Sequence, residues 1–194
     1  MSTKITIGLF VGGQGRRMGG VPKGLLRTPD GSETLLERLR RQCARVAPEA
    51  SIYLVGQAPS YAALGWPELA DNPSGIGPLG GLRALLLRAL ADGSQLALAF
   101  SCDLPFLDEP AIAALVTPFS GLTRVPFAHG RLQPLAAAYA PQATLSAVDR
   151  SLSLGKHALM HVLDQLGAEL ERVEFDDERA RAFCDWDTPE DMQR

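Results

Sequence analysis

The chain has 194 residues, of which 46% are hydrophobic and 21% are charged, and its formal net charge is −3. This length and composition predict a single globular domain over residues 1–194, and the slight acidic excess argues against a nucleic-acid binder. The chain has no apolar run near the roughly 20 residues that a membrane span needs, and no signal-peptide pattern. We therefore expect a cytoplasmic protein with no membrane attachment.

Strand-like and helix-like segments alternate along the first half of the chain. The apolar run from Ile5 to Val11 predicts a buried strand, and apolar residues at helical spacing predict a helix over Thr34 to Val46. A second strand is expected from Ser51 to Val55, a helix from Gly80 to about Ala91, and a central strand from Gln95 to Cys102.

The second half continues this alternation with shorter segments. Thr188 is expected to cap a terminal helix that has Pro189 at its first position. Strands that alternate with helices predict an α/β fold of three layers, with a mostly parallel sheet. The expected helices here are 111–116, 143–152 and 157–166, and the expected strands are 123–126, 135–139 and 170–175.

A loop rich in glycine and arginine, residues 12–20, follows the first expected strand. It fits neither the Walker A motif nor the dinucleotide-binding fingerprint. Its glycines can bring backbone N–H groups against phosphate oxygens, and the cations beside them can neutralise a triphosphate. The alternative is a flexible surface loop with incidental cations. The residues concerned are Gly12, Gly13 and Gly15, with Arg16, Arg17 and Lys23.

Aspartates follow other expected strands. Asp103 comes directly after an apolar run and can hold Mg²⁺, while Asp71 opens a Pro- and Gly-rich loop and can accept hydrogen bonds from a base or a sugar hydroxyl. Asp185 and Asp187 flank Trp186, and in a strand both would point to the same face. Parallel strands end at one edge of a sheet, so we expect a ligand site there. Turn formation or a solvated acidic surface is the alternative role for these side chains.

Taken together, these segments resemble the molybdenum cofactor guanylyltransferases, the MobA-type enzymes. Residues 9–25 match the family's first block, and residues 77–81, 102–105, 131–135 and 187–191 match later blocks in the same order, so the resemblance covers nearly the whole chain. Four positions depart from the family pattern. Val11 stands where alanine is usual, Pro22 where aspartate is common, and Asp185 and Asp187 where asparagines are typical.

The resemblance implies a Rossmann-like three-layer α/β/α nucleotidyltransferase fold. It also implies transfer of GMP from GTP to a molybdopterin-type cofactor, with Mg²⁺ as metal cofactor and release of pyrophosphate. Lys23, Arg17 and Asp103 are then the catalytic residues, Asp103 also holds the metal, and Gln133, Asp185 and Asp187 are candidates for binding the acceptor. The nucleotide-binding residues implied are Phe10, Val11, Gly12, Gly13, Gly15, Arg16, Lys23, Asp71, Gly77, Pro78, Leu79 and Asp103.

Other functions remain open at this point. The two aspartates at 185 and 187 also fit a CTP-using cofactor cytidylyltransferase, and other sugar- or cofactor-phosphate nucleotidyltransferases share the first block. A non-catalytic nucleotide-binding protein is disfavoured, because Lys23 and Asp103 are both present. We expect GTP and the cofactor as ligands, contacts with cofactor-biosynthesis or target proteins, and a monomer or weak oligomer.

Overall fold

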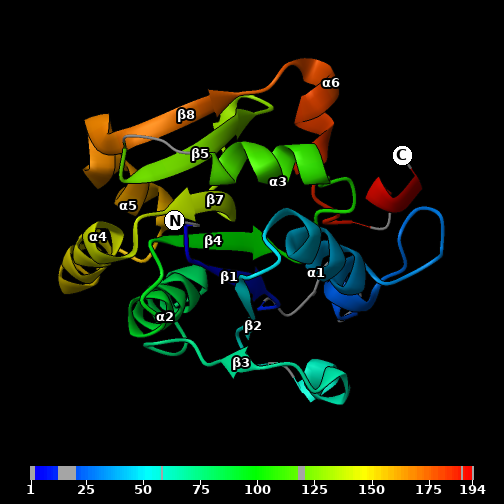
Figure 1. Ribbon diagram of the computed structural model, residues 1–194, viewed down its shortest axis with the longest axis horizontal. Helices are drawn as coiled ribbons and strands as arrows, with labels where there is room; N and C mark the ends of the chain where they lie inside the picture. The colour runs from blue at the N-terminus through cyan, green and yellow to red at the C-terminus, as the bar shows by residue number, and fades with distance from the viewer. Residues whose placement is uncertain (1–2, 13–20, 58, 118–120, 189, 194) are drawn as a thin grey trace.

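The computed structural model describes residues 3–12, 21–57, 59–117, 121–188 and 190–193. Within these residues, eight strands form one sheet in the order β3-β2-β1-β4-β7-β5-β6, and β8 pairs with β5 (Figure 1). The strands are β1 Ile5–Phe10, β2 Ser51–Val55, β3 Glu68–Leu69, β4 Leu96–Ser101, β5 Thr123–Ala128, β6 Arg131–Leu132, β7 Ala136–Tyr139 and β8 Leu170–Glu174.

The centre of the sheet is parallel. β1 pairs in parallel with both β2 and β4, β2 pairs in parallel with β3, and β8 pairs in parallel with β5. The exceptions are β7, which runs antiparallel to β4 and to β5, and β6, which runs antiparallel to β5. The prediction of a mostly parallel sheet is confirmed, although the two reversed strands were not foreseen. The carboxyl ends of β1 to β4 therefore lie at the same edge of the sheet.

Helices cover both faces of the sheet, as the three-layer prediction requires (Figure 1). On one face, Leu36 and Leu39 of α1 join Ile112 of α3 in a buried apolar cluster. On the other face, α2, α4 and α5 supply a second cluster that includes Leu85 and Val148. The helices are α1 Leu35–Val46, α2 Pro78–Ala91, α3 Glu109–Val116, α4 Pro141–Ser153, α5 Leu159–Leu166 and α6 Asp177–Ala180.

Local sequence explains where two of these helices begin. Thr34 and Glu37 form a reciprocal capping box at the start of α1. The helix α2 begins at Pro78, two residues before the predicted start, because proline is tolerated at the first helical position and Gly77 adopts a φ of 75° before it. No helix among the described residues is long and apolar enough to cross a membrane.

The predicted terminal helix is wrong. Among the residues described at this end of the chain, the helical structure is limited to a short 3₁₀ turn, Asp191–Gln193. The hydroxyl of Thr188 donates to the carboxylate of Asp191 instead of accepting a bond as a helix cap, and Asp191 also accepts from the backbone N–H groups of Asp187 and Thr188. Pro189 lies outside the described residues.

Candidate active site

The carboxyl ends of four parallel strands bring four loops together at one edge of the sheet. Gly12 follows β1, Gly56 follows β2, Asp71 follows β3 and Asp103 follows β4. Backbone hydrogen bonds fix the starts of these loops against one another. The N–H of Val11 donates to the carbonyl of Val55 at 3.0 Å, and the N–H of Cys102 donates to the carbonyl of Phe10 at 3.1 Å. The predicted convergence is confirmed for Asp71, Asp103 and the start of the glycine loop at Gly12, whereas residues 13–20 of that loop lie outside the described residues.

Lys23 lies between two carboxylates at this edge. Its ammonium Nζ donates to Oδ2 of Asp103 at 2.9 Å and to Oδ1 of Asp187 at 2.6 Å. Burial lowers the pKa of Lys23, but the hydrogen bonds and charges of the two aspartates outweigh burial and leave the pKa above its ordinary value. Lys23 is therefore a permanently charged group at neutral pH.

The backbone around Lys23 is held by the fold. Lys23 starts the 3₁₀ turn Lys23–Leu25, and the N–H of Gly24 in that turn donates to the buried hydroxyl of Tyr61 at 3.1 Å. A Cβ added at Gly24 would lie 3.1 Å from the ring of Tyr61, which is tighter than normal packing. Glycine at this position therefore lets the lysine turn pack directly on the tyrosine.

Asp103 is the more enclosed of the two carboxylates, with 14% of its side chain exposed against 48% for Asp187. The hydroxyl of Ser101 donates to its second oxygen, Oδ1. The backbone carbonyl of Asp103 accepts from the N–H of Trp186 at 3.0 Å. This bond fixes the C-terminal segment on the Asp103 loop and places Asp187 opposite Asp103.

Asp71 forms the far end of the site. An added Cβ at Gly81 would lie 3.1 Å from its Oδ1, and one at Gly56 would lie 3.9 Å from the same oxygen and 3.2 Å from the backbone nitrogen of Gly12. Burial raises the pKa of Asp71. Among the described residues no group donates a hydrogen bond to this carboxylate, so it is available to N–H or O–H donors of a ligand.

Several predicted nucleotide contacts can come only from the backbone. The side chains of Phe10, Val11 and Leu79 are buried in the core. The carbonyl of Phe10 and the N–H of Val11 are already engaged, whereas the N–H of Gly12 donates to no other described group. Gly77 and Pro78 form the start of α2. Gly13, Gly15, Arg16 and Arg17, which were also predicted to bind or act on the nucleotide, lie outside the described residues.

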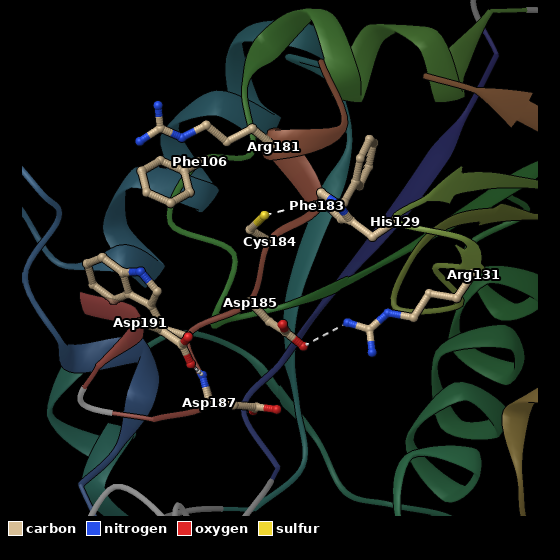
Figure 2. A pocket seen from close by; sticks show the side chains of 10 residues that line it. Phe106, His129, Arg131, Arg181, Phe183, Cys184, Asp185, Asp187 and Asp191 are labelled. Carbon is tan, nitrogen blue, oxygen red and sulfur yellow. Dashed lines mark hydrogen bonds and ion pairs between the residues drawn. The ribbon is translucent and has the colours of Figure 1, made fainter. Parts of the chain in front are cut away.

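Asp185 and Asp187 do not share a strand face, so that expectation is wrong. The segment that carries them, residues 184–187, is not a strand. The two side chains have different partners, because Asp187 bonds Lys23 while Oδ2 of Asp185 accepts from Arg131 at 3.4 Å (Figure 2). Gln133, the third acceptor candidate, donates to the carbonyl of Ala128 at 3.3 Å.

Two pockets flank the ion pair of Arg131 and Asp185, and both residues line both pockets. One, of about 460 Å³, has Asp103 and Gln133 in its wall. The other, of about 370 Å³, has Asp187 in its wall (Figure 2). The second pocket also contains side chains that sequence reasoning missed, because the fold assembles them from separate loops. They are Phe106, His129, Arg131, Arg181, Phe183, Cys184 and Trp186.

Comparison with known proteins agrees with this geometry. The model of the MobA-like NTP transferase domain family matches residues 9–172. A molybdenum cofactor guanylyltransferase of Cereibacter sphaeroides is 31% identical over 187 residues, which cover 96% of this chain and 92% of the relative. A probable molybdenum cofactor guanylyltransferase of Methanosarcina mazei is 29% identical, with 95% of this chain and 87% of the relative covered.

Solved structures show the same fold. Molybdopterin-guanine dinucleotide biosynthesis protein A of Archaeoglobus fulgidus superimposes with a TM-score of 0.73 at 19% identity, covering 97% of this chain and 95% of that one. The 2-C-methyl-D-erythritol 4-phosphate cytidylyltransferase of Thermus thermophilus superimposes with a TM-score of 0.65 at 17% identity, covering 100% and 96% of the two chains. The chain therefore belongs to the MobA-like NTP transferase family and is a nucleotidyltransferase.

Proposed function

We propose that this protein transfers GMP from GTP to a molybdopterin-type cofactor and releases pyrophosphate. The observation that carries the proposal is the placement of the Lys23 ammonium between Asp103 and Asp187, with Asp71 at the other end of the same edge. This arrangement suits a nucleoside triphosphate, because Asp71 can accept hydrogen bonds from the nucleoside and the Lys23 ammonium can bind the phosphates. The names of the relatives supply the nucleobase and the acceptor.

In this proposal each group has one task. Asp71 accepts hydrogen bonds from the guanosine part, and the N–H of Gly12 faces the phosphates. Lys23 leaves its carboxylate partners and bonds the phosphates. A terminal phosphate oxygen of the acceptor attacks the α-phosphorus, the new P–O bond forms, and the bond to the β-phosphate oxygen breaks. The attacking oxygen is already anionic, so positioning and charge stabilisation carry the rate and no strong general base is needed.

The residues present fit a magnesium ion. Mg²⁺ in nucleotide sites takes one or two carboxylates and completes its shell with phosphate oxygens and water. Asp103 and Asp187 both lie within hydrogen-bond distance of one cationic group, the Lys23 ammonium. Among the described residues no three His, Cys, Asp or Glu side chains lie close enough together to hold a metal ion. The protein alone would therefore not fill the coordination shell of the metal. Asp103 would hold the ion, which when bound would offset charge on the triphosphate.

Pyrophosphate release in the presence of molybdenum cofactor tests the proposal, with GTP, CTP and ATP supplied singly and in competition. We expect turnover with GTP that depends on the cofactor. Lys23→Ala should lower kcat/KM for GTP by roughly 100-fold, the loss usual for one preorganised charge-stabilising group. Lys156→Ala, which removes an exposed lysine beyond α4, is the matched control. Preference for CTP would overturn the guanine assignment.

A further inference from the structure

Cys184 lies in a different setting from the two other cysteines of the chain. Cys43 and Cys102 are buried in the core, and burial raises the pKa of each of these thiols to about 12. Cys184 is partly exposed and lines the pocket of about 370 Å³ described above (Figure 2). Of the three thiols, Cys184 is therefore the one that a dissolved reagent can reach.

We propose that Cys184 is a site of reversible S-thiolation, where a small thiol that carries carboxylates attaches as a mixed disulfide. We call the cavity around it the Cys184 pocket and define it by His129, Arg131, Arg181, Cys184, Asp185 and Trp186. This chemistry does not depend on nucleotidyl transfer, so it stands or falls separately from the proposed function.

The imidazole of His129 holds the sulfur of Cys184. Its Nε2 lies 3.2 Å from Sγ of Cys184 and 2.9 Å from the backbone carbonyl of Ala180 (Figure 2). A carbonyl oxygen only accepts hydrogen bonds, so Nε2 carries a hydrogen, and the sulfur accepts from this same N–H. A donor directed at the sulfur favours the thiolate over the thiol, and the thiolate is the reactive form.

A tight hairpin between β5 and β6 places His129. Ala128 and Arg131 pair across the hairpin, and His129 and Gly130 form the two-residue turn between them. The φ angles of the two turn residues are 52° and 74°, both positive, as a type I′ turn requires. Asparagine, aspartate and glycine are the usual first residues of such a turn. The hairpin therefore does not need a histidine, and the ring is available to act on Cys184.

A disulfide at Cys184 needs a sulfur from outside the chain. The chain has three cysteines, and the other two are buried in the core. The volume of the Cys184 pocket, about 370 Å³, lies in the range of roughly 300–1,000 Å³ that is usual for small-molecule pockets. We therefore assign the second sulfur to a small molecule.

The pocket supplies hydrogen-bond donors for the body of such a molecule. Trp186 is part of its wall and only 4% exposed, and among the described residues nothing accepts from its indole N–H, which is costly for a buried group. Arg181 is exposed at the rim, lies over the Phe106 ring at 4.3 Å and forms no ion pair with a described residue. Carboxylate and amide oxygens of a ligand can accept from both groups.

The acidic side chains of the pocket already have partners. Asp185 accepts from Arg131 at 3.4 Å, and Asp187 accepts from Lys23 at 2.6 Å. Asp191 accepts from two backbone N–H groups and one hydroxyl. Cations or donors thus offset these three carboxylates, which leaves Arg181 to attract a carboxylate of the entering molecule.

The exchange is balanced between its two reactants. The thiolate of Cys184 attacks one sulfur of a small disulfide, a new S–S bond forms, and the S–S bond of the reagent breaks. The other half leaves as a thiolate and takes a proton from water. Cys184 is oxidised and the departing thiol is reduced, so no further oxidant is needed, and an excess of the reduced thiol reverses the step.

Mass spectrometry of the intact protein tests the proposal, with glutathione disulfide as the probe at neutral pH. We expect one glutathionyl group per chain, mapped to Cys184 and removed by excess reduced glutathione. In Cys184→Ser we expect no adduct, because the remaining two thiols are buried. In guanidinium chloride all three cysteines of the unmodified chain should react, which shows that the reagent is active.

The reaction rate distinguishes an activated thiol from one that is only exposed. Partial burial alone would make Cys184 react more slowly in the folded chain than in the unfolded chain. With His129 donating to the sulfur, we expect the folded chain to react about threefold faster. A tenfold rise in the thiolate fraction is offset about threefold by the lower nucleophilicity of a more acidic thiol.

His129→Asn should remove this gain, because it deletes the ring and keeps a residue that type I′ turns favour. His157→Asn, at an exposed position between α4 and α5, is the matched control and should leave the rate unchanged. Thermal melting checks that the variants are folded. Three results would overturn the proposal: no adduct on the folded protein, the same adduct in Cys184→Ser, or a folded rate below the unfolded rate. An unchanged rate in His129→Asn would refute the role of His129.

A second disulfide tests the class of ligand. Cystamine offers the same S–S bond but has ammonium groups in place of carboxylates and amides. If Trp186 and Arg181 bind acceptor oxygens, folding should favour the glutathionyl adduct over the cysteamine adduct about tenfold, the usual effect of one hydrogen bond to a charged group. The unfolded chain gives the reference ratio for the two reagents. Equal stability of the two adducts in the folded protein would show that the pocket does not select carboxylates, and this assignment would be wrong.

Discussion

Replacing Asp187 with asparagine keeps the size of the side chain and removes one of the two carboxylate charges that contact the Lys23 ammonium. The Lys23–Asp187 distance is the shorter of the two, 2.6 Å against 2.9 Å for Asp103, but Asp187 is 48% exposed. A pair screened to this extent contributes about 0.2–1 kcal/mol. The substitution should therefore lower the free energy of unfolding by no more than about 1 kcal/mol, and the melting temperature by no more than about 4 °C.

The same change should strengthen binding of GTP. In the nucleotide-free protein Asp187 competes with the triphosphate for Lys23 and repels its negative charge. In the variant the triphosphate no longer has to break the Lys23–Asp187 pair, so the free energy of GTP binding becomes more favourable by the energy of that pair, about 0.2–1 kcal/mol. The Kd for GTP should then fall by about 1.5- to 5-fold in magnesium-free buffer, and added salt should shrink the difference.

Calorimetric titration with GTP measures this effect. Asp185→Asn is the matched control, because it removes the same charge two residues earlier from a side chain that bonds Arg131 and not Lys23. We expect the control to bind GTP as the unmodified protein does. If Asp187→Asn binds GTP more weakly than the unmodified protein, Asp187 orients Lys23 toward the nucleotide, and the idea that it competes with the nucleotide is refuted.

Three further substitutions test other parts of the site. Asp71→Asn should raise the melting temperature at neutral pH, because burial raises the pKa of Asp71 and the ionised carboxylate therefore destabilises the folded state. This gain in melting temperature should vanish as the pH falls below the ordinary aspartate pKa of 3.8, where the carboxyl group is protonated in both states. A gain that persists at that pH would contradict this cause. Gly81→Ala would put a Cβ 2.8 Å from Phe10 and Val55. That crowding costs about 1–3 kcal/mol against a helix-propensity gain of about 0.5–1, so denaturant unfolding should show a loss on the order of 1 kcal/mol, and a more stable variant would refute the packing argument. Asp103→Ala should abolish Mg²⁺-dependent turnover and the effect of Mg²⁺ on GTP binding, while the circular dichroism spectrum stays unchanged. If GTP binding by this variant still responds to Mg²⁺, Asp103 is not a ligand of the metal.

The elements that sequence reasoning predicted well are those with local causes. The helix α1 starts at its capping box, where Thr34 and Glu37 are three residues apart. The strand β2 was predicted with its observed bounds, Ser51–Val55, from an apolar run between a proline and a glycine. Such signals lie within a few residues, and the chain alone displays them.

The features that were missed depend on contacts between distant residues. The strand β6 has only two residues, too few for any period to appear. The bond from Lys23 to Asp187 spans 164 positions, and no spacing rule connects them. The aspartates 185 and 187 were expected to act together, yet the irregular path of the segment directs one to Arg131 and the other to Lys23. Tertiary structure determined these outcomes.

The bond between the N–H of Trp186 and the carbonyl of Asp103 has a consequence for how the protein matures. The ribosome makes β1 to β4, with Lys23 and Asp103, before the segment that carries Trp186 and Asp187, yet a single domain folds as a unit. Asp187 reaches Lys23 only when this final segment docks on the Asp103 loop. We therefore expect the carboxylate pair around Lys23 to be completed only after the last part of the chain has been made.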